Sequence, residues 1–363
     1  MRFLQNNPED IRLAGSALRN GKLVAIPTET VYGLAGNIWE PSAVAGIFKA
    51  KERPNFDPLI VHIADPGDVS LVADTSSPLL PLLVEAFWPG PLTLILPRKT
   101  CVSDLITSGL DTVAVRCPAL ALTREIIAAS RVPVAAPSAN LFGRLSPTTA
   151  EHVAEQLGAR IDYIVDGGQT SIGVESTILD ISGDQPLILR PGALPAEKIA
   201  VVLPGIQVKE RQTFDNPNAP GQLLNHYAPR KPLLLADTGK LTDQYFLDNL
   251  AGKAISMLQE ANTPASYSYR QECVAPESLF RHRAALTFGR EQTALVLASG
   301  LFEKVFDLSP ELSDIEAAVQ LFVLLHKLEA TACDSIWVEP LPARGLGLAI
   351  NDRLRKASLK LNL

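Results

Sequence analysis

Short apolar runs alternate with helical patterns over residues 22–205 of the 363-residue chain. Most of the runs end at proline or a polar cluster, which predicts strands. The predicted strands are 22–28, 58–64, 91–97, 112–118, 133–139, 162–168, 176–182 and 186–192. Helical spacing predicts helices at 8–20, 40–51, 77–90, 121–131 and 148–161. Because the connections mix short and long, we expect a mixed sheet in an α/β fold.

Residues 206–230 lack this periodicity and are rich in Asn and Pro, so they predict a long linker or lid. A second α/β pattern follows. Its predicted strands are 231–238, 253–259, 293–299 and 335–340, and its predicted helices are 313–332 and 345–358. We therefore expect a first domain at 1–205, a linker or lid at 206–230 and a smaller Rossmann-like α/β domain at 231–363.

Charge and composition narrow the function. The formal net charge is -6, with 17 Lys/Arg against 22 Asp/Glu in residues 1–210 and 16 against 17 in the rest. Binding of nucleic acid over a broad basic surface is therefore not expected, although the overall charge does not exclude a local basic cleft. No apolar run has the roughly 20 residues that span a bilayer. The four cysteines are far apart, so we expect a cytoplasmic protein with reduced thiols and no zinc site.

Polar residues stand at the ends of two early predicted elements. In "IPTETVYGLAG" the strand ends in Thr28, Glu29 and Thr30, where ligand sites tend to lie, although solvated hydroxyls would look the same. In "KAKERPNFDP" a helix C-terminus explains the lysines, but Pro54 leaves Arg53 on a loop. Lys51 together with the fork-shaped guanidinium of Arg53 suits phosphate oxygens.

Two further strands carry a polar side chain among apolar neighbours. His62 in "PLIVHIA" alternates onto the face opposite its immediate neighbours; a core or edge histidine and one that faces a cleft are both open. Arg116 in "VAVRCP" is expected to meet a carboxylate, either from the protein or from a ligand, because arginine is rarely buried unpaired.

The later strands end in polar loops. "APSANLFGRLSPT" is a glycine-containing loop that either wraps a nucleotide or only connects. Glu175 and Ser176 begin one strand, and Arg190 ends another. No GxSxG, HExxH or Walker A motif appears. Cations and hydroxyls without a protein nucleophile favour phosphoryl or nucleotidyl transfer, in which positioning and charge neutralisation drive the reaction.

The ordered series "PTETVYGL", "KERPNFDPLIVHI", "WPGPLTLIL", "VAVRCP", "PSANLFGRLSPT", "GVESTI" and "LRPGA" resembles the YrdC-type threonylcarbamoyl-AMP synthases over residues 10–205. "HYAP" at 226–229, followed by a second domain, resembles the long form of that family. The resemblance implies a YrdC-like twisted, largely open sheet around a positively charged central cavity. It also implies the formation of threonylcarbamoyl-AMP and pyrophosphate from L-threonine, bicarbonate and ATP with Mg²⁺. A separate transferase would then use the product to modify tRNA beside the anticodon.

The same resemblance implies roles for single residues. It places Lys51, Arg53, Ser138 and Asn140 at the ATP phosphates as the catalytic set. The implied nucleotide side also contains Asp57, Thr112, Ser146, Arg190 and, as a lid residue, Tyr227. The implied threonine pocket is Thr30, His62, Arg116, Ala136 and Ser176. No metal ligand is expected from the protein.

One departure and two alternatives accompany this expectation. The family's linker usually reads "PGMKYRHYAP", whereas this chain has "PGQLLNHYAP". The Lys and Arg of the family's stretch are missing here, so any role of theirs in binding phosphate is in doubt for this chain. A module of the same fold that binds double-stranded RNA or tRNA without synthesis of the adenylate is the main alternative. A carbamoyl-transfer enzyme is disfavoured, because its CxxC pairs and acylphosphatase-like segment are absent from the sequence.

Overall fold

The computed structural model describes residues 1–54, 57–208, 227–260 and 280–360. The chain divides into two compact units. The first contains Met1–Phe142 and Ser146–Leu224, and the second contains Gly143–Leu145 and Asn225–Leu363. The division therefore falls inside the predicted linker at 206–230, most of which lies outside the described residues. The grouping of residues 143–145 with the second unit was not predicted from the sequence.

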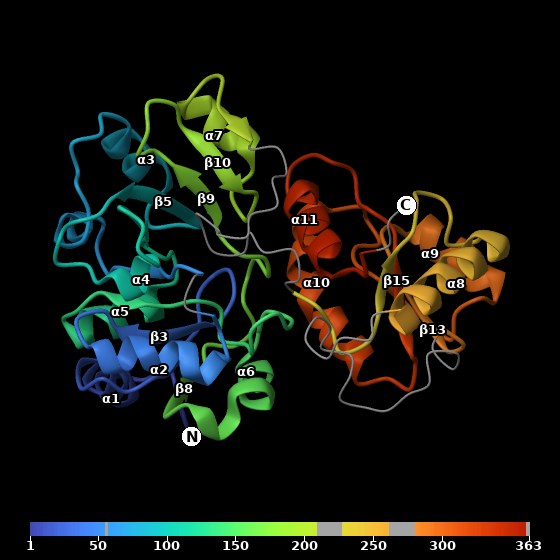
Figure 1. The fold of residues 1–363 in the computed structure, drawn as a ribbon, viewed down its shortest axis with the longest axis horizontal. Coiled ribbons are helices and arrows are strands. Elements are labelled where there is room, and N and C mark those ends of the chain that lie inside the picture. Colours follow the sequence, from blue (N-terminus) through green and yellow to red (C-terminus); the bar gives the residue numbers. More distant parts are fainter. Residues whose placement is uncertain (55–56, 209–226, 261–279, 361–363) are drawn as a thin grey trace. The chain divides into compact units, whose positions relative to one another are not determined.

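The first unit is built on a mixed sheet of eleven described strands (Figure 1). Their spatial order is β1-β8-β2-β3-β7-β4-β6-β5-β9-β10-β11. Parallel and antiparallel pairs alternate irregularly across it, as the mixed connections predicted. The strands are β1 (Arg2–Leu4), β2 (Val24–Ile26), β3 (Gly33–Asn37), β4 (Ile60–His62), β5 (Leu92–Pro97), β6 (Thr112–Arg116), β7 (Val134–Ala135), β8 (Tyr163–Val165), β9 (Thr177–Asp180), β10 (Leu187–Arg190) and β11 (Gln207–Val208).

Seven α-helices and two short 3₁₀ helices of the described chain belong to this unit, and several of them begin at a residue whose side chain accepts from the backbone N–H groups of the first turn. Asn7 caps the first helix by accepting from the backbone N–H groups of Glu9 and Asp10. In Figure 1 α2 lies across β3, against which it packs. The helices are α1 (Pro8–Arg19), α2 (Pro41–Lys51), η1 (Pro66–Leu71), α3 (Leu79–Phe87), α4 (Asp104–Thr107), α5 (Ala121–Ser130), α6 (Ala150–Leu157), η2 (Gly158–Arg160) and α7 (Ala196–Val202).

Apolar burial fixes the central strands. Val61 of β4, Val115 of β6 and Leu94 of β5 are fully buried in one core. Burying such side chains contributes about 1.5–3 kcal/mol each relative to exposure. The strand order then places His62 beside Arg116, since β4 and β6 are parallel and these two residues are in register. The apolar core thus holds two polar side chains at one end of neighbouring strands.

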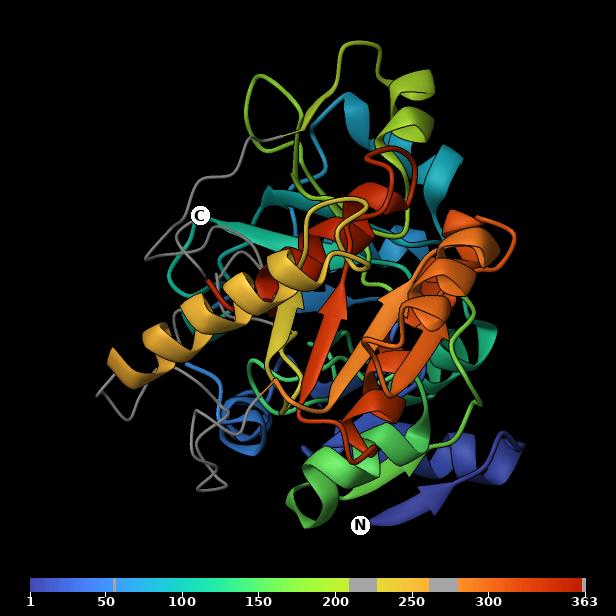
Figure 2. The same cartoon turned by 90° about the vertical axis from the view of Figure 1, so that its right-hand side faces the viewer.

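The second unit is a four-stranded parallel sheet in the order β12-β15-β13-β14. Figure 2 shows its strands side by side as yellow and orange arrows that point the same way. Its elements are β12 (Leu233–Leu235), α8 (Gln244–Glu260), β13 (Arg283–Thr287), α9 (Arg290–Ser299), β14 (Lys304–Asp307), α10 (Asp314–Glu329), β15 (Ser335–Val338) and α11 (Gly347–Ala357).

Most predicted elements are confirmed, and two strand predictions are wrong. Residues 253–259 and 293–299 belong to the helices α8 and α9. Short apolar runs occur in strands and in partly buried helices alike, so periodicity did not separate the two. Among the described helices, none has the length and apolar character needed to cross a membrane. The cysteines of the described residues, Cys101, Cys117 and Cys333, are free thiols.

Candidate active site

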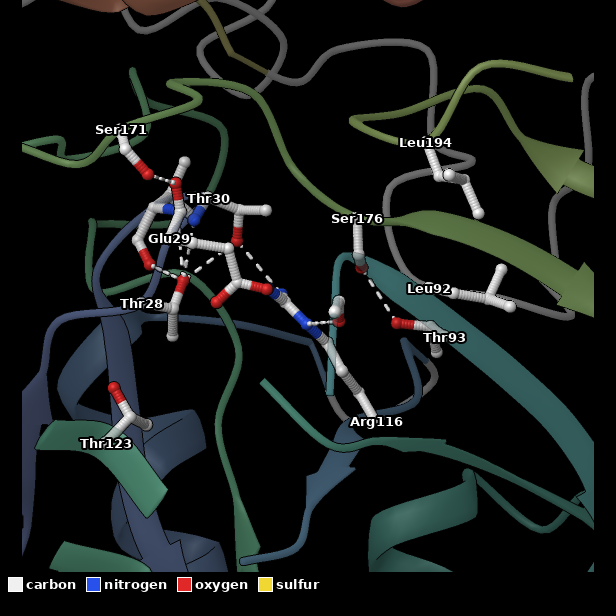
Figure 3. A network of polar contacts seen from close by, with 12 residues as sticks. Thr28, Glu29, Thr30, Leu92, Thr93, Arg116, Thr123, Ser171, Ser176 and Leu194 are labelled. Atoms are coloured by element: carbon white, nitrogen blue, oxygen red, sulfur yellow. Dashed lines mark hydrogen bonds and ion pairs between the residues drawn. The ribbon is translucent and has the colours of Figure 1, made fainter. Parts of the chain in front are cut away.

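Arg116 stands at the centre of a buried polar network at the end of β6 (Figure 3). The residue is 4% exposed. Its Nη2 donates to Glu29 Oε1 at 2.6 Å, its Nη1 donates to Thr30 Oγ1 at 2.9 Å, and its Nε donates to the carbonyl of Gly90 at 3.4 Å. The expectation that Arg116 meets a carboxylate is confirmed, and that carboxylate comes from the protein.

Glu29 is the carboxylate that this network adds to the predicted set. Burial raises the pKa of Glu29, but the charge and hydrogen bond of Arg116, together with the nearby backbone N–H groups of Ala119 and of Glu29 itself, outweigh burial and leave the pKa below its ordinary value. Glu29 Oε1 is paired with Arg116, whereas the buried Oε2 has no hydrogen-bond partner among the described residues. A buried carboxylate oxygen without a donor is costly, so it marks a place where a ligand can bind.

The backbone that carries Glu29 and Thr30 is fixed on both sides. The N–H of Ile172 donates to the Glu29 carbonyl at 2.9 Å, and the N–H of Gly173 donates to the Thr30 carbonyl at 3.1 Å. The Thr28 hydroxyl oxygen accepts from the N–H of Thr30 at 3.1 Å and lies 2.8 Å from the Thr30 hydroxyl. The polar strand end is therefore a rigid turn that was recognised in the sequence only as a set of side chains.

His62 is a neutral member of the same cluster. Burial, together with the charge of Arg116, lowers its pKa to about 3. Its Nδ1 lies 3.2 Å from the Ile60 carbonyl. An imidazole without charge can donate or accept a hydrogen bond but does not repel a ligand cation.

Lys51 ends α2 and points toward the polar loop that follows β7. Its Nζ donates to the carbonyls of Ser138 at 2.5 Å and Asn140 at 2.6 Å. Burial and the charge of Arg53 lower the pKa of Lys51, and Asp57 acts in the opposite direction. An ammonium has three N–H donors, so one of them has no partner among the described residues.

Arg53 and Asp57 form a buried ion pair beside Lys51. The Arg53 Nη2 lies 2.8 Å from Asp57 Oδ2 and donates to the Pro58 carbonyl at 2.9 Å. Burial raises the pKa of Asp57, although the charges of Arg53, Lys51 and Arg190 oppose this. Three cations surround one carboxylate, which leaves an excess of positive charge that suits a polyanion.

Hydrogen bonds join Arg190, at the end of β10, to Ser176, directly before β9. Arg190 Nη2 donates to the Ser176 carbonyl at 2.8 Å and to its hydroxyl at 3.2 Å, and that hydroxyl lies 2.8 Å from Thr93 Oγ1. A side chain at Gly192 would lie 2.4 Å from the backbone of Ser176, so only glycine permits this approach. Figure 3 shows Thr93 of β5 and Ser176, which directly precedes β9, pointing at each other.

The remaining predicted residues are less closely joined. Ser146 donates to Glu175 Oε1, and the N–H of Ala136 donates to the Ile60 carbonyl at 3.0 Å, beside His62. Thr112 begins β6, about 13 Å along the strand from Arg116, so the two lie at opposite ends. Tyr227 is grouped with the second unit, where its ring is 5.9 Å from that of Phe322 and 5.3 Å from the Arg353 guanidinium. Its role as a lid stays a prediction.

Three residues of the network were not assigned from the sequence: Glu29, Thr93 and Glu175. Each pairs with a residue that is far away in the chain; Glu29 and Arg116 are 87 positions apart. Glu29 was noted as part of a polar strand end, and that was the signal that could have found it. The described residues contain no group of three or more His, Cys, Asp or Glu that could hold a metal ion.

A buried carboxylate–guanidinium pair and an excess of buried cations on one mixed sheet suit one class of protein, an enzyme that joins an amino acid to a polyanion. Comparisons with known proteins show which family of enzymes this is. Residues 16–192 match a family model described as "Telomere recombination" (Sua5, YciO and YrdC), and residues 194–358 match the "Threonylcarbamoyl-AMP synthase, C-terminal domain".

Two full-length relatives are named threonylcarbamoyl-AMP synthase. The one from Pyrococcus abyssi is 38% identical over 96% of this chain and 94% of its own length, and the one from Bacillus subtilis is 38% identical over 98% and 94%. A crystal structure of P. abyssi Sua5 complexed with L-threonine has a TM-score of 0.80 and 37% identity, covering 98% of this chain and 97% of that one. The chain belongs to the threonylcarbamoyl-AMP synthase family.

Proposed function

We infer that this chain is a threonylcarbamoyl-AMP synthase, a nucleotidyltransferase that supplies the modification of tRNA with threonylcarbamoyladenosine. The observation that carries this inference is the pair of charge patterns in one sheet. Arg116 with Glu29 offers complementary charges to a free amino acid. Lys51, Arg53 and Arg190 around Asp57 offer excess positive charge to a triphosphate. Full-length relatives that carry the synthase name favour this function over an RNA-binding module.

The proposed reaction has two steps. In the first, the amine of L-threonine in its neutral form attacks the carbon of bicarbonate; an N–C bond forms and hydroxide leaves as water with a proton from nitrogen. In the second, a carboxylate oxygen of the resulting carbamate attacks the α-phosphorus of ATP. The bond from that phosphorus to the bridging oxygen breaks, and pyrophosphate leaves with the electron pair. No protein nucleophile is required, so the protein contributes positioning and charge neutralisation.

The residues divide between the two substrates. In the proposal the neutral His62, Thr30 and the Ser176 hydroxyl contact the threonine side chain, because a hydroxyl needs both a donor and an acceptor. The third N–H of Lys51 and the guanidiniums of Arg53 and Arg190 take the phosphates. These cations stabilise the charge that builds on pyrophosphate as it leaves.

Mg²⁺ belongs to the substrate in this proposal. The carboxylate nearest the cations, Asp57, is already paired with Arg53, and the described residues form no cluster that would hold a metal alone. Mg²⁺ usually binds through phosphates, one or two carboxylates and water, so it would enter with ATP. The product is a mixed anhydride that hydrolyses readily, and we propose that it passes to a separate transferase acting on tRNA.

Pyrophosphate release from Mg–ATP tests the function. We expect release only when both L-threonine and bicarbonate are present, with each omission reducing the rate to background. Release that is indifferent to both omissions, or no release by folded protein, would contradict the synthase reaction. In the second case, tRNA binding by the same preparation would shift the assignment to an RNA-binding module.

A further inference from the structure

Glu29 has a hydrogen-bonding capacity that the described part of the chain does not use. The residue is 6% exposed, and its backbone is fixed by the hydrogen bonds from Ile172 and Gly173. Oε1 is committed to Arg116 at 2.6 Å. Oε2 is buried and has no hydrogen-bond partner among the described residues. Figure 3 shows the carboxylate with one oxygen toward the guanidinium and the other turned away from it.

Arg116 has unused capacity of the opposite kind. A guanidinium has five N–H donors. Three hydrogen bonds, to Glu29, Thr30 and the Gly90 carbonyl, engage one donor on each nitrogen. Among the residues that the structure describes, one N–H therefore remains without a partner on each terminal nitrogen, and two guanidinium N–H groups can bind the two oxygens of a carboxylate. Together the two residues offer a ligand two donors and one anionic acceptor.

This set is complementary to the common part of every free α-amino acid, which has a carboxylate and a nitrogen that carries hydrogen. We propose that Glu29 is a substrate-binding residue whose Oε2 accepts a hydrogen bond from the α-amino nitrogen of the amino acid, while Arg116 binds the α-carboxylate. The inference rests on the proposed function, in which L-threonine is that amino acid. It adds a residue that selects for the amine.

The charge state of Glu29 fits an acceptor better than a general base. The pKa of its carboxyl is held below the ordinary value by Arg116, so the group stays ionised and takes up a proton poorly. The N-carboxylated amino acid keeps one N–H, so the hydrogen bond to Oε2 can persist after that step. The new negative charge would be repelled by Glu29 and attracted by the cations that are expected to hold ATP.

A purely structural role makes a different prediction. If Glu29 only holds Arg116 in place, its loss weakens every ligand that has a carboxylate. If Glu29 binds the nitrogen, its loss weakens only ligands that have one. A ligand without nitrogen would even gain, because the Arg116 charge would no longer be offset by a neighbouring carboxylate.

Binding of two probes to Glu29→Gln separates these roles. The probes are L-threonine, measured by calorimetry, and 3-hydroxybutanoate of matching configuration, measured by displacement of threonine. We expect the wild type to bind threonine at least tenfold more tightly than 3-hydroxybutanoate, as a charge-assisted hydrogen bond allows. In E29Q the threonine Kd should rise tenfold or more, while the Kd of 3-hydroxybutanoate should stay the same or fall.

Controls keep each outcome decisive. Glu339→Gln removes an equally buried carboxylate from the second unit and should leave both Kd values within twofold of the wild type. Glu29→Asp keeps the charge but shortens the reach, and if E29Q fails to fold it takes its place, with threonine alone weakened. Equal weakening of both probes, or no preference for threonine in the wild type, would overturn the role of Glu29. A wild type that binds no threonine would overturn the proposed function itself.

Discussion

Two buried carboxylates, one in each unit, show how a binding residue differs from a structural one. Glu29 and Glu339 are each 6% exposed and each follows a strand. Glu339 Oε1 accepts from the N–H of Leu241 at 2.8 Å, and its Oε2 accepts from the N–H of Gly239 at 2.8 Å and from Gln292 at 2.7 Å. Both oxygens of Glu339 accept hydrogen bonds, whereas one oxygen of Glu29 has no hydrogen-bond partner within the described segments.

Two lysines, one in each unit, differ in the same way in how many of their N–H donors have partners. Lys231 in the second unit, which is half-buried, donates to the carbonyls of Leu328 and Thr331 at 2.9 and 2.5 Å and approaches the Thr331 hydroxyl at 3.3 Å. Lys51 donates to two carbonyls and has a third N–H without a partner among the described residues. Burial alone does not mark a binding site. What distinguishes Glu29 and Lys51 is a buried hydrogen-bonding group without a partner in the described part of the first unit.

The largest effect is expected from Lys51→Met, which keeps the volume and removes the charge. It takes away two hydrogen bonds to carbonyls and the proposed contact with phosphate. We expect kcat/KM for ATP to fall about 100-fold or more, which corresponds to about 2.7 kcal/mol. Pyrophosphate release at saturating threonine and bicarbonate measures it. Lys231→Met is the matched control: it should lower the melting temperature yet leave kcat/KM within threefold, and an equal loss in both variants would break the comparison.

Arg116→Ala should act on the amino acid and not on the nucleotide. Removing the guanidinium leaves Glu29 as an unpaired buried carboxylate and removes both donors for the substrate carboxylate. We expect the threonine KM to rise about 30-fold, which corresponds to about 2 kcal/mol, with the ATP KM changed less than threefold. Steady-state kinetics with each substrate varied in turn gives both values. Equal rises in the two KM values would mean that Arg116 is only structural.

Glu339→Gln tests the other side of the comparison through stability. The amide nitrogen of glutamine cannot accept, so at least one of the three donors around Glu339 loses its partner. We expect a loss of about 1–2 kcal/mol in the free energy of unfolding. Denaturant unfolding monitored by the fluorescence of Trp337, buried in the second unit, reports it when Trp39 and Trp88 are replaced by Phe. An unchanged denaturant midpoint would show that the hydrogen bonds to Glu339 do not stabilise the second unit, which would contradict its structural role.

His62 affects only the pH dependence of stability, and the sign of that effect follows from its pKa. In the unfolded chain histidine titrates near 6.5, whereas burial lowers the pKa of native His62 to about 3. As the pH falls from about 6.5 to 3, the unfolded chain binds a proton that the native protein does not, so stability is lost. The loss is at most about 1.4 kcal/mol per pH unit.

His62→Gln should therefore flatten the fall of unfolding free energy with pH between 6 and 4. Urea unfolding at several pH values measures the slope. His282 is the contrasting control, because its hydrogen bond to Glu303 raises its pKa and its stabilising effect is present at low pH and lost as the pH rises. His282→Gln should not flatten the acid slope. A slope that is unchanged in H62Q would contradict a buried, neutral His62.

Much of this arrangement is predictable from the residues, and the limits have physical causes. Alternation in "PLIVHIA" and "VAVRCP" predicts β4 and β6, and the rarity of unpaired buried arginine predicts a carboxylate for Arg116. The identity of that carboxylate is not predictable locally, because Glu29 is brought to Arg116 only by the order of strands in the sheet. Local patterns specify elements, and pairing across the sheet specifies the site.

The second unit shows a different limit. The strands β13 and β14 were not predicted, because "RAALT" and "KVFD" are short and carry charges at their ends. The runs at 253–259 in α8 and 293–299 in α9 are longer than either strand and were predicted to be strands. An apolar run was therefore not enough to identify a strand. The helix α9 exposes Leu295 and Leu297, so its apolar residues do not gather on one face with helical spacing.

The most direct test follows the atoms of the proposed reaction. The protein is incubated with Mg–ATP, L-threonine and ¹³C-bicarbonate, and the nucleotide products are examined by mass spectrometry and ¹³C NMR. The account predicts one labelled carbon in an adduct of AMP and threonine, together with one equivalent of pyrophosphate. ADP with phosphate, or AMP with pyrophosphate and no labelled adduct even when the products are analysed within seconds, would contradict it.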